Sequence, residues 1–237
     1  MIARLRYLLP DIPAFPALLS LFLALCISFT FARVFNFNLS AFVRAGHPWS
    51  NPAVLGPNFI VRPDTGHSGQ FYYRLSVEPW TTQRVAHAVT LDNPPYRQQR
   101  IFYSLVAWCL SLGDQAWVPA VMLGVNILAL TAIGWLGGLW TMHLGRHAGW
   151  GLLLPLHLGF AYSMCLDLTE ILQMCLALAA LLLWTQRRFW PAGVFLALSV
   201  LAKETTLLFA VAGVRPGRCV PDWSLFKLRG LEHGCQF

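Results

Sequence analysis

Long apolar runs separated by short polar segments dominate the pattern of hydrophobic and polar positions along this chain. The runs over residues 13–35 and 117–140 are each long enough to cross a bilayer as a helix, which takes roughly 20 residues. A third run, over residues 191–214, is also long enough, but Lys203 and Glu204 interrupt it. These runs predict transmembrane helices.

Three further apolar runs are shorter, and they fix the number of crossings. Residues 150–166 and 168–184 are marginal to adequate for a span, whereas residues 101–112 would form only ~18 Å of helix against a ~30 Å hydrocarbon core. We therefore expect residues 101–112 to be interfacial or half inserted. The one long polar stretch covers about residues 36–100 and is expected to be a loop.

The positions of the arginines orient the runs. Two arginines precede the first run, and no small-residue cleavage site follows it, so we expect an uncleaved helix with a cytoplasmic N-terminus. With residues 101–112 not counted as a crossing, Arg146, Arg187 and Arg188 fall on the cytoplasmic side, as the positive-inside rule prefers. The expected fold is all-α, a multi-spanning helical bundle of about five spans with a long extracytoplasmic first loop.

Composition supports a membrane protein and excludes several other classes. Of 237 residues, 57% are apolar and 11% are charged, against about 25% charged residues in a typical soluble domain. This composition excludes a soluble globule, a disordered chain and a disulfide-rich secreted module. The net charge of +7 could suggest nucleic acid, but the basic residues lie between the apolar runs, so no nucleic-acid partner is expected.

Lys203 and Glu204 are the clearest polar groups within an apolar run. A charge at the centre of a membrane helix costs roughly 2.5–3.5 kcal/mol on insertion scales, so such a group suggests a function. Neighbours on a helix point in different directions, and each therefore needs its own partner. We prefer a contact between Lys203 and an anionic group; the alternative is a lysine that reaches to the interface.

Asp167 and Glu170 form a second acidic pair, expected at the extracytoplasmic surface. Their spacing of three residues puts both on one face of a helix if the turn is helical. The alternative is a helix N-terminus, with Asp167 or Thr169 as the cap and Glu170 in the first turn. Both interpretations stay open.

Two blocks in the loop combine aromatic and polar side chains, residues 66–75 and 91–101. Arg97 and Arg100 lead into an apolar run, where their guanidinium groups would suit a phosphate at headgroup level, although they could simply anchor the helix. The tyrosines of the first block could be interfacial residues or platforms on which a sugar stacks.

The predicted topology brings these acids and cations to one side of the bilayer, at the depth of a lipid phosphate. This arrangement suits transfer of a group from a lipid phosphate. A carboxylate would take a proton from an acceptor hydroxyl, and cations would stabilise the departing phosphate. A transporter fits less well, because its site is expected near the midplane between repeats, and the chain shows no internal repeat.

Four motifs resemble a bacterial family of multi-spanning glycosyltransferases with the GT-C fold. They are residues 69–74 (GQFYYR), 92–97 (DNPPYR), 99–101 (QRI) and 201–205 (LAKET). The resemblance covers about residues 10–213. Members are associated with cell-surface glycopolymer formation, and aminoarabinose–lipid A transferases and protein O-mannosyltransferases are more distantly similar.

The resemblance implies a polyprenyl-phosphate-linked sugar as donor, an extracytoplasmic glycan or lipid as acceptor, and a bacterial inner membrane as location. It also implies a carboxylate base in the first loop, just before Gly69. Ser68 occupies that position here, which leaves Asp92 as the best remaining acid in the loop.

The expected site combines acids with phosphate- and sugar-binding side chains. The expected catalytic residues are Asp92, Glu170 and Glu204, and the expected substrate-binding residues are Gln70, Tyr72, Tyr73, Arg74, Asn93, Tyr96, Arg97, Arg100 and Lys203. The metal requirement is left open, with a divalent cation as one alternative.

The family fold normally continues for several more helices. We therefore expect a membrane domain over residues 1–214 and an aberrant polar tail over residues 215–237, as in a truncated or frame-shifted product. A second hypothesis is a non-catalytic homologue that binds lipid or assists assembly.

Overall fold

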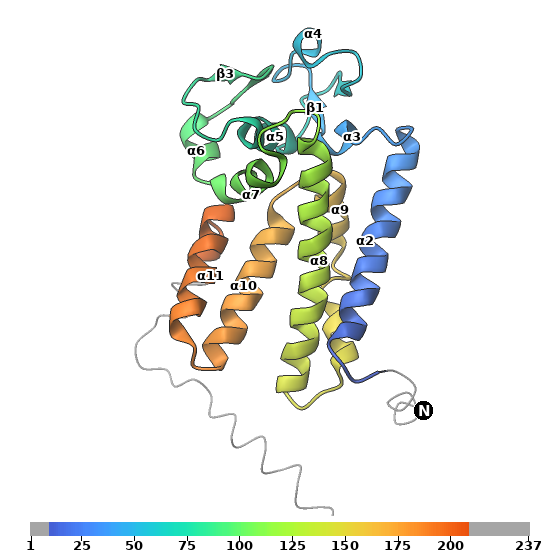
Figure 1. Ribbon diagram of the computed structural model, residues 1–237, viewed down its shortest axis with the longest axis vertical. Coiled ribbons are helices and arrows are strands. Elements are labelled where there is room, and N and C mark those ends of the chain that lie inside the picture. Colours follow the sequence, from blue (N-terminus) through green and yellow to red (C-terminus); the bar gives the residue numbers. More distant parts are fainter. Residues whose placement is uncertain (1–9, 209–237) are drawn as a thin grey trace, which may run out of the picture.

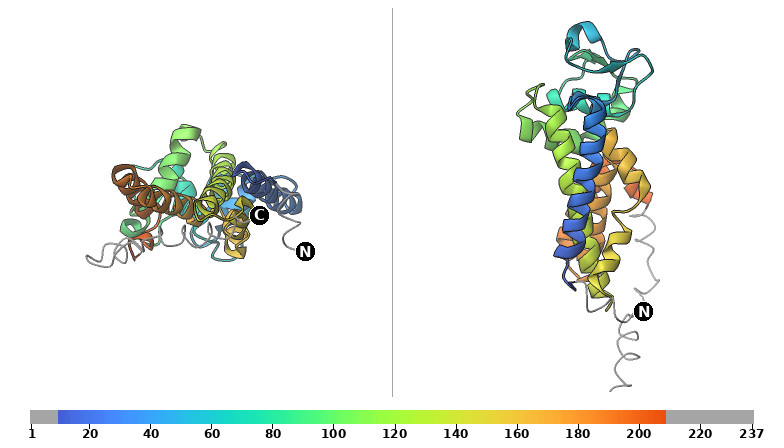
Figure 2. Two further views of the ribbon diagram at one scale, coloured as in Figure 1. Left: turned by 90° about the horizontal axis from the view of Figure 1, so that it is seen from below. Right: turned by 90° about the vertical axis from the view of Figure 1, so that its right-hand side faces the viewer.

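The computed structural model describes residues 10–208 as a mostly helical molecule with a cap at one end of a helical bundle (Figure 1). The expected tail at 215–237, the end of the 191–214 run and the N-terminal arginines lie outside the described residues. Figure 2 shows the cap at one end of the long helices, seen from the side.

Among the described residues, the bundle consists of six helical elements. They are α2 (Ala14–Val34), α8 (Val118–His143), η1 (Ala148–Leu153), α9 (Leu158–Cys165), α10 (Glu170–Thr185) and α11 (Phe189–Ala202). Within residues 10–208, α2 and α8 are long and apolar enough to cross a membrane, as the sequence predicted. At ~1.5 Å per residue, α10 and α11 are shorter than a ~30 Å core.

The cap, defined here as residues 36–117, includes the segment 36–100, which was expected to be a loop but contains short helices and strands, and the short apolar run 101–112, which forms one helix. It contains α3 (Ser40–Val43), α4 (Pro52–Leu55), α5 (Gly69–Val77), α6 (Pro94–Gln98) and α7 (Ile101–Ser111). Two pairs of two-residue strands add to the helices: β1 (Ala45–Gly46) is parallel to β2 (Val61–Arg62), and β3 (Val85–Ala86) is antiparallel to β4 (Val89–Thr90).

The run over residues 150–166 does not form one continuous helix. It divides between η1 and α9. Pro155 falls between them, where its missing N–H and fixed φ interrupt a continuous helix. His157 then starts α9, because its side chain accepts a hydrogen bond from the backbone N–H of Gly159.

Small residues explain how α2 packs on α8. Along α2 the buried positions include Ala17, Ser20 and Ala24, whereas Leu18 and Phe22 of the same helix are exposed. Membrane helices approach closely through such small side chains because lipid gives them little hydrophobic reason to associate. The apolar outer face of α2 is consistent with contact to lipid.

Gly134 of α8 faces α2 with no room for a side chain. A Cβ atom built there would lie 2.2 Å from Ser20 Oγ and 2.6 Å from the Pro16 carbonyl oxygen. Gly124, on the same helix, would meet no atom within 4 Å. The sequence signal for this contact is the spacing of small residues on both helices.

These two glycines give a matched test of the α2–α8 contact. We expect Gly134→Ala to lower the free energy of unfolding by about 1–3 kcal/mol, because the added methyl group forces the helices apart. Gly124→Ala should leave stability unchanged or slightly higher, since alanine favours the helix. Thermal unfolding in detergent measures both, and equal effects at the two positions would contradict this packing.

Candidate functional site

Arg100 and Glu204 join the cap to the end of the bundle. Arg100 precedes α7, and Glu204 follows α11, 104 residues later in the chain. The guanidinium binds the carboxylate through both of its oxygens, with Nε donating to Oε2 at 2.7 Å. The same guanidinium lies over the Tyr96 ring and donates to its hydroxyl. The Arg100 side chain is only 10% exposed, whereas that of Glu204 is 39% exposed, so the guanidinium is shielded from water and the carboxylate is partly open to it.

Lys203 and Glu170 form the second connection at this end of the bundle. The Lys203 ammonium donates to Glu170 Oε1 at 2.6 Å. Lys203 is the extended C-cap of α11, so it and Glu204 leave the helix end toward different partners. The expectation that each needs its own partner is confirmed. The helix ends here rather than carrying the two charges through its middle.

Asp92 and Arg97 form a third pair within the cap. Arg97 donates from Nε and Nη2 to the two carboxylate oxygens of Asp92, at 2.8 and 2.7 Å. Its remaining nitrogen, Nη1, donates to Ser68 Oγ at 3.1 Å, and the guanidinium stacks 4.2 Å from the Phe71 ring centre. Arg97 is thus committed to protein groups. A carboxylate in place of Ser68 would meet the same guanidinium.

We call these six charged residues the junction cluster, namely Asp92, Arg97, Arg100, Glu170, Lys203 and Glu204. Their ion pairs lie within the cap, between the cap and the end of α11, and between that end and the start of α10. Figure 1 shows the cap over the adjoining ends of α10 and α11. Tyr96 bridges the two arginines, with its ring centre 5.5 Å from the Arg97 guanidinium. The cluster has three cations and three acids and is therefore neutral overall.

The ion pairs set the protonation of two of the acids. Hydrogen bonds from Arg97 hold the pKa of Asp92 below its usual value. Hydrogen bonds from Arg100 likewise lower the pKa of Glu204. Both carboxylates are therefore ionised at neutral pH and suited to hold cations in place. A lowered pKa makes them weaker bases for taking a proton.

Glu170 differs from the other two acids in its hydrogen bonding. Its Oε2 atom is buried and has no hydrogen-bond partner among residues 10–208. It lies in the first turn of α10, as the sequence predicted. Thr169 occupies the N-cap position, but its hydroxyl donates to the Ala202 carbonyl at 3.2 Å instead of capping.

Asp167 does not share a helical face with Glu170 and does not lie at the surface. It stands before α10 with a left-handed backbone (φ 46°) and is fully buried. The sequence interpretation of a helical pair at the extracytoplasmic surface was wrong, because the chain turns sharply between α9 and α10.

Several expected substrate-binding residues instead support the cap from within. Gln70 Oε1 accepts hydrogen bonds from the Gly46 N–H and the Ser50 hydroxyl. Tyr73 packs against Phe59, and Arg74 is fully buried and donates to the Gln83 carbonyl.

Two other expected substrate-binding residues lie nearer the junction cluster. Burial raises the pKa of Tyr72 to about 12, an effect that the neighbouring Arg100 partly offsets. Asn93 is exposed at the start of α6.

His67 is a neighbour of the cluster that the sequence analysis did not select. Its Nδ1 atom is buried without a hydrogen-bond partner within the described residues, and Nε2 lies 3.4 Å from the Tyr162 hydroxyl. Burial lowers the pKa of the imidazole, while the charge of Glu170 partly opposes that shift. Its place beside Ser68 in the 66–75 block was the available signal.

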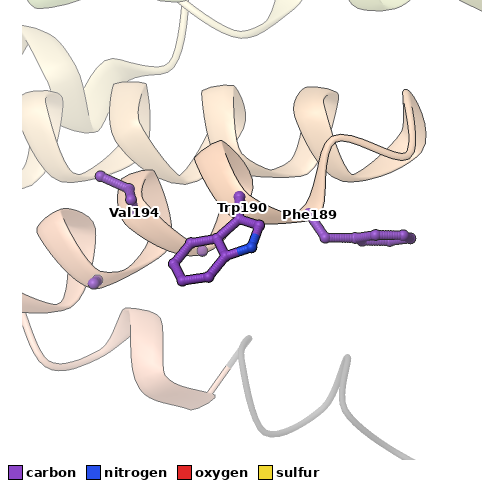
Figure 3. Close-up of a pocket in the computed structure, with 5 residues that line it drawn as sticks. Phe189, Trp190 and Val194 are labelled. Carbon is purple, nitrogen blue, oxygen red and sulfur yellow. The ribbon is translucent and has the colours of Figure 1, made fainter.

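An apolar hollow of about 400 Å³ lies at the other end of α11, lined by Phe189, Trp190, Gly193, Val194 and Ala197 (Figure 3). Figure 3 shows Phe189, Trp190 and Val194 along one side of the helix. The lining of the hollow ends at Ala197, six residues before Lys203, and contains no charged residue. It is therefore separate from the junction cluster.

The described residues offer no group of three or more His, Cys, Asp or Glu side chains that could hold a metal ion. A divalent cation at the junction cluster would need ligands beyond these acids, each of which binds a cationic side chain.

Comparisons with known proteins give no relative. No family model matches the chain, and neither a curated protein nor a solved structure matches it.

The Asp92–Arg97 pair predicts a shift that can be measured directly. Arg97→Gln should raise the pKa of Asp92 toward 3.8, its ordinary value, because the hydrogen bonds that favour the ionised form are lost. In the wild type, the pair stabilises the folded protein at pH values above 3.8. This stabilisation should be lost as the pH falls through the lowered pKa that Asp92 has in the folded protein.

Carboxyl NMR of the isotope-labelled protein follows this titration. Arg146→Gln, at an exposed arginine outside the cluster, should leave the Asp92 midpoint unchanged. An unaltered midpoint in Arg97→Gln would rule out the pair.

Proposed function

We propose that this protein is a multi-pass membrane protein of glycosyltransferase type, which binds the phosphate of a polyprenyl-phosphate-linked sugar at the junction cluster. The sugar would pass to an extracytoplasmic glycan or lipid. The observation that carries the proposal is the ion pair of loop residue Arg100 with Glu204 at the end of α11, next in the chain to Lys203, which is paired with Glu170.

The proposed orientation follows from the position of the cap. We place the cap outside the bacterial inner membrane and the N-terminus in the cytoplasm, with about five membrane segments. Two of these are α2 and α8; the others would be η1 with α9, α10 and α11. The junction cluster, where the cap meets α10 and α11, would then lie at the depth of lipid headgroups.

The cluster contains the charged groups that are needed to transfer a sugar from a lipid phosphate. Arg100 presents a planar fork suited to phosphate oxygens, and Lys203 presents a compact ammonium. In the structure each is bound to an acid. A phosphate must therefore compete with or extend these ion pairs. The nearby carboxylates would keep the cations in position until the lipid arrives.

Glu170 is the acid best placed to act as the base. An oxygen of the acceptor hydroxyl would attack the anomeric carbon while the bond from that carbon to the phosphate oxygen breaks. The hydroxyl proton would pass to Glu170 Oε2, and the lipid phosphate would leave with the bonding electrons. Asp92 and Glu204 would hold Arg97 and Arg100 in position through their ion pairs.

Ser68 supports a second candidate, a homologue that binds the lipid phosphate without transferring the sugar. Its hydroxyl accepts a hydrogen bond from Arg97 at the place where the family resemblance implies a catalytic carboxylate. A serine hydroxyl is not a base at neutral pH. The two candidates share the phosphate site and differ only in turnover.

Binding of polyprenyl phosphate to the purified protein in detergent tests the shared site. We expect Lys203→Gln and Arg100→Gln each to weaken binding about tenfold, which corresponds to ~1.4 kcal/mol. Arg146→Gln removes one exposed positive charge outside the cluster and should bind as the wild type does. Equal binding by all four proteins, each with an unchanged melting temperature, would contradict the site.

Sugar transfer from a polyprenyl-phosphate donor separates the two candidates. An active enzyme should lose at least 100-fold of its rate in Glu170→Gln, the lower end of the usual contribution of a general base, roughly 10²–10⁴. If the wild type binds lipid but shows no turnover, Ser68→Asp should introduce transfer. No turnover in either protein would favour a binding role alone.

A further inference from the structure

A fully buried acid–amide pair lies in the core between α8 and the start of α10. Asp167 and Asn126 are both 0% exposed. Both Asp167 carboxyl oxygens and Asn126 Oδ1 are buried without a hydrogen-bond partner among the described residues. Buried acceptors without donors are costly and rare, so three of them in neighbouring side chains require an explanation.

The hydrogen bonds around Asn126 show what this pair lacks. The Tyr103 hydroxyl donates its one hydrogen to the Met122 carbonyl at 3.1 Å, and therefore accepts from Asn126 Nδ2 at 3.0 Å. One amide hydrogen is thus used, and a second is left to face Asp167. The Asn126 amide lies near enough to the Asp167 carboxyl to oppose part of the rise that burial causes in its pKa. That second hydrogen can serve one Asp167 oxygen, because an amide does not donate to its own oxygen. The other Asp167 oxygen and Asn126 Oδ1 are left without a donor among these side chains.

We infer that Asp167 and Asn126 form a buried proton-binding site in which the Asp167 carboxyl binds one proton at neutral pH. A carboxylic acid and a carboxamide can make two reciprocal hydrogen bonds. The acid O–H donates to Asn126 Oδ1, and Asn126 Nδ2 donates to the other acid oxygen. An ionised carboxylate would instead face the Asn126 amide oxygen with no hydrogen between them, and the two oxygens would repel each other.

The surroundings agree with a neutral acid. Burial raises the pKa of Asp167 well above its usual range, and no cationic side chain of the described residues opposes that shift. The titratable groups that sense its charge are Tyr103 on α7 and Cys165 on α9, both of which are neutral acids themselves. Glu170 lies three residues further along and is paired with Lys203.

The proton site has a structural consequence for the junction cluster. The network joins α7, α8 and the segment that leads into α10, through Tyr103, Asn126 and Asp167. Loss of the proton would place a negative charge in the core beside the turn that positions Glu170. The inference does not rest on sugar transfer or on lipid binding.

Infrared spectroscopy of the full-length protein tests the inference directly. At neutral pH the wild type should show the carbonyl band of a protonated carboxylic acid that resists exchange with bulk water. Asp167→Asn should remove this band, and Asp114→Asn, at an exposed aspartate, should retain it. Asn126→Ala should keep the band but shift its frequency, because the acid loses its partner. A wild-type spectrum without such a band at neutral pH would overturn the site.

Thermal stability gives a second, independent readout. Because the folded pKa is raised, stability from the protonated acid is present at low pH and is lost as pH rises through that pKa. The melting temperature of the wild type should therefore fall toward alkaline pH more steeply than that of Asp167→Asn, whose amide donates permanently. A competing outcome is that the wild type melts at a higher temperature in sodium chloride than in choline chloride, and that Asp167→Asn does not. That result would show that the site binds a metal cation instead of a proton, and would overturn the inference.

Discussion

The ion pair between Arg100 and Glu204 is the contact on which the arrangement of cap and bundle depends. It joins residues 104 positions apart, and it forms where a helical bundle ends and the Arg100 side chain is only 10% exposed. A charge in such a place must have a partner, because desolvation of an unpaired charge costs several kcal/mol. The partner can only come from another segment of the chain, and this requirement brings the cap onto the end of α11.

The same requirement explains the neighbouring contacts. Lys203 stands beside Glu204 in the chain and points to Glu170, so α11 is tied to both the cap and α10 at one point. Within the cap, Asp92 orients Arg97, and Ser68 accepts its remaining N–H. Below the cluster, the buried Tyr103 and Asn126 continue the polar contacts into the core. Burial thus increases from the junction cluster, whose acids are partly exposed, to Tyr103 and Asn126, which are fully buried.

The helices of the bundle could be predicted from the sequence because membrane helices satisfy their backbone hydrogen bonds locally and show it as long apolar runs. The runs at 13–35 and 117–140 became α2 and α8 with small shifts at their ends. The run at 150–166 misled the prediction, since composition outweighed the single Pro155. The cap could not be predicted in detail, because its short helices depend on tertiary contacts such as that of Gln70 with the Gly46 backbone.

The charged residues of the site could be identified by sequence, but their partners could not. Lys203 and Glu204 stood out because charges are rare in apolar runs. Nothing local indicated that Glu204 meets Arg100, or that Asp167 is buried rather than exposed. Asn126 could have been noticed in the sequence as a polar amide within the apolar run at 117–140. Its role could not be inferred from the sequence, because only the structure places it near Asp167.

A double-mutant cycle between Arg100 and Glu204 tests this account most directly. The free energies of unfolding of Arg100→Met, Glu204→Gln and the double variant, measured in detergent, give the coupling between the two side chains. We expect a favourable coupling of about 1 kcal/mol or more, above that of most exposed ion pairs. Additive effects of the two substitutions would show that the cap is not joined to α11 through this pair.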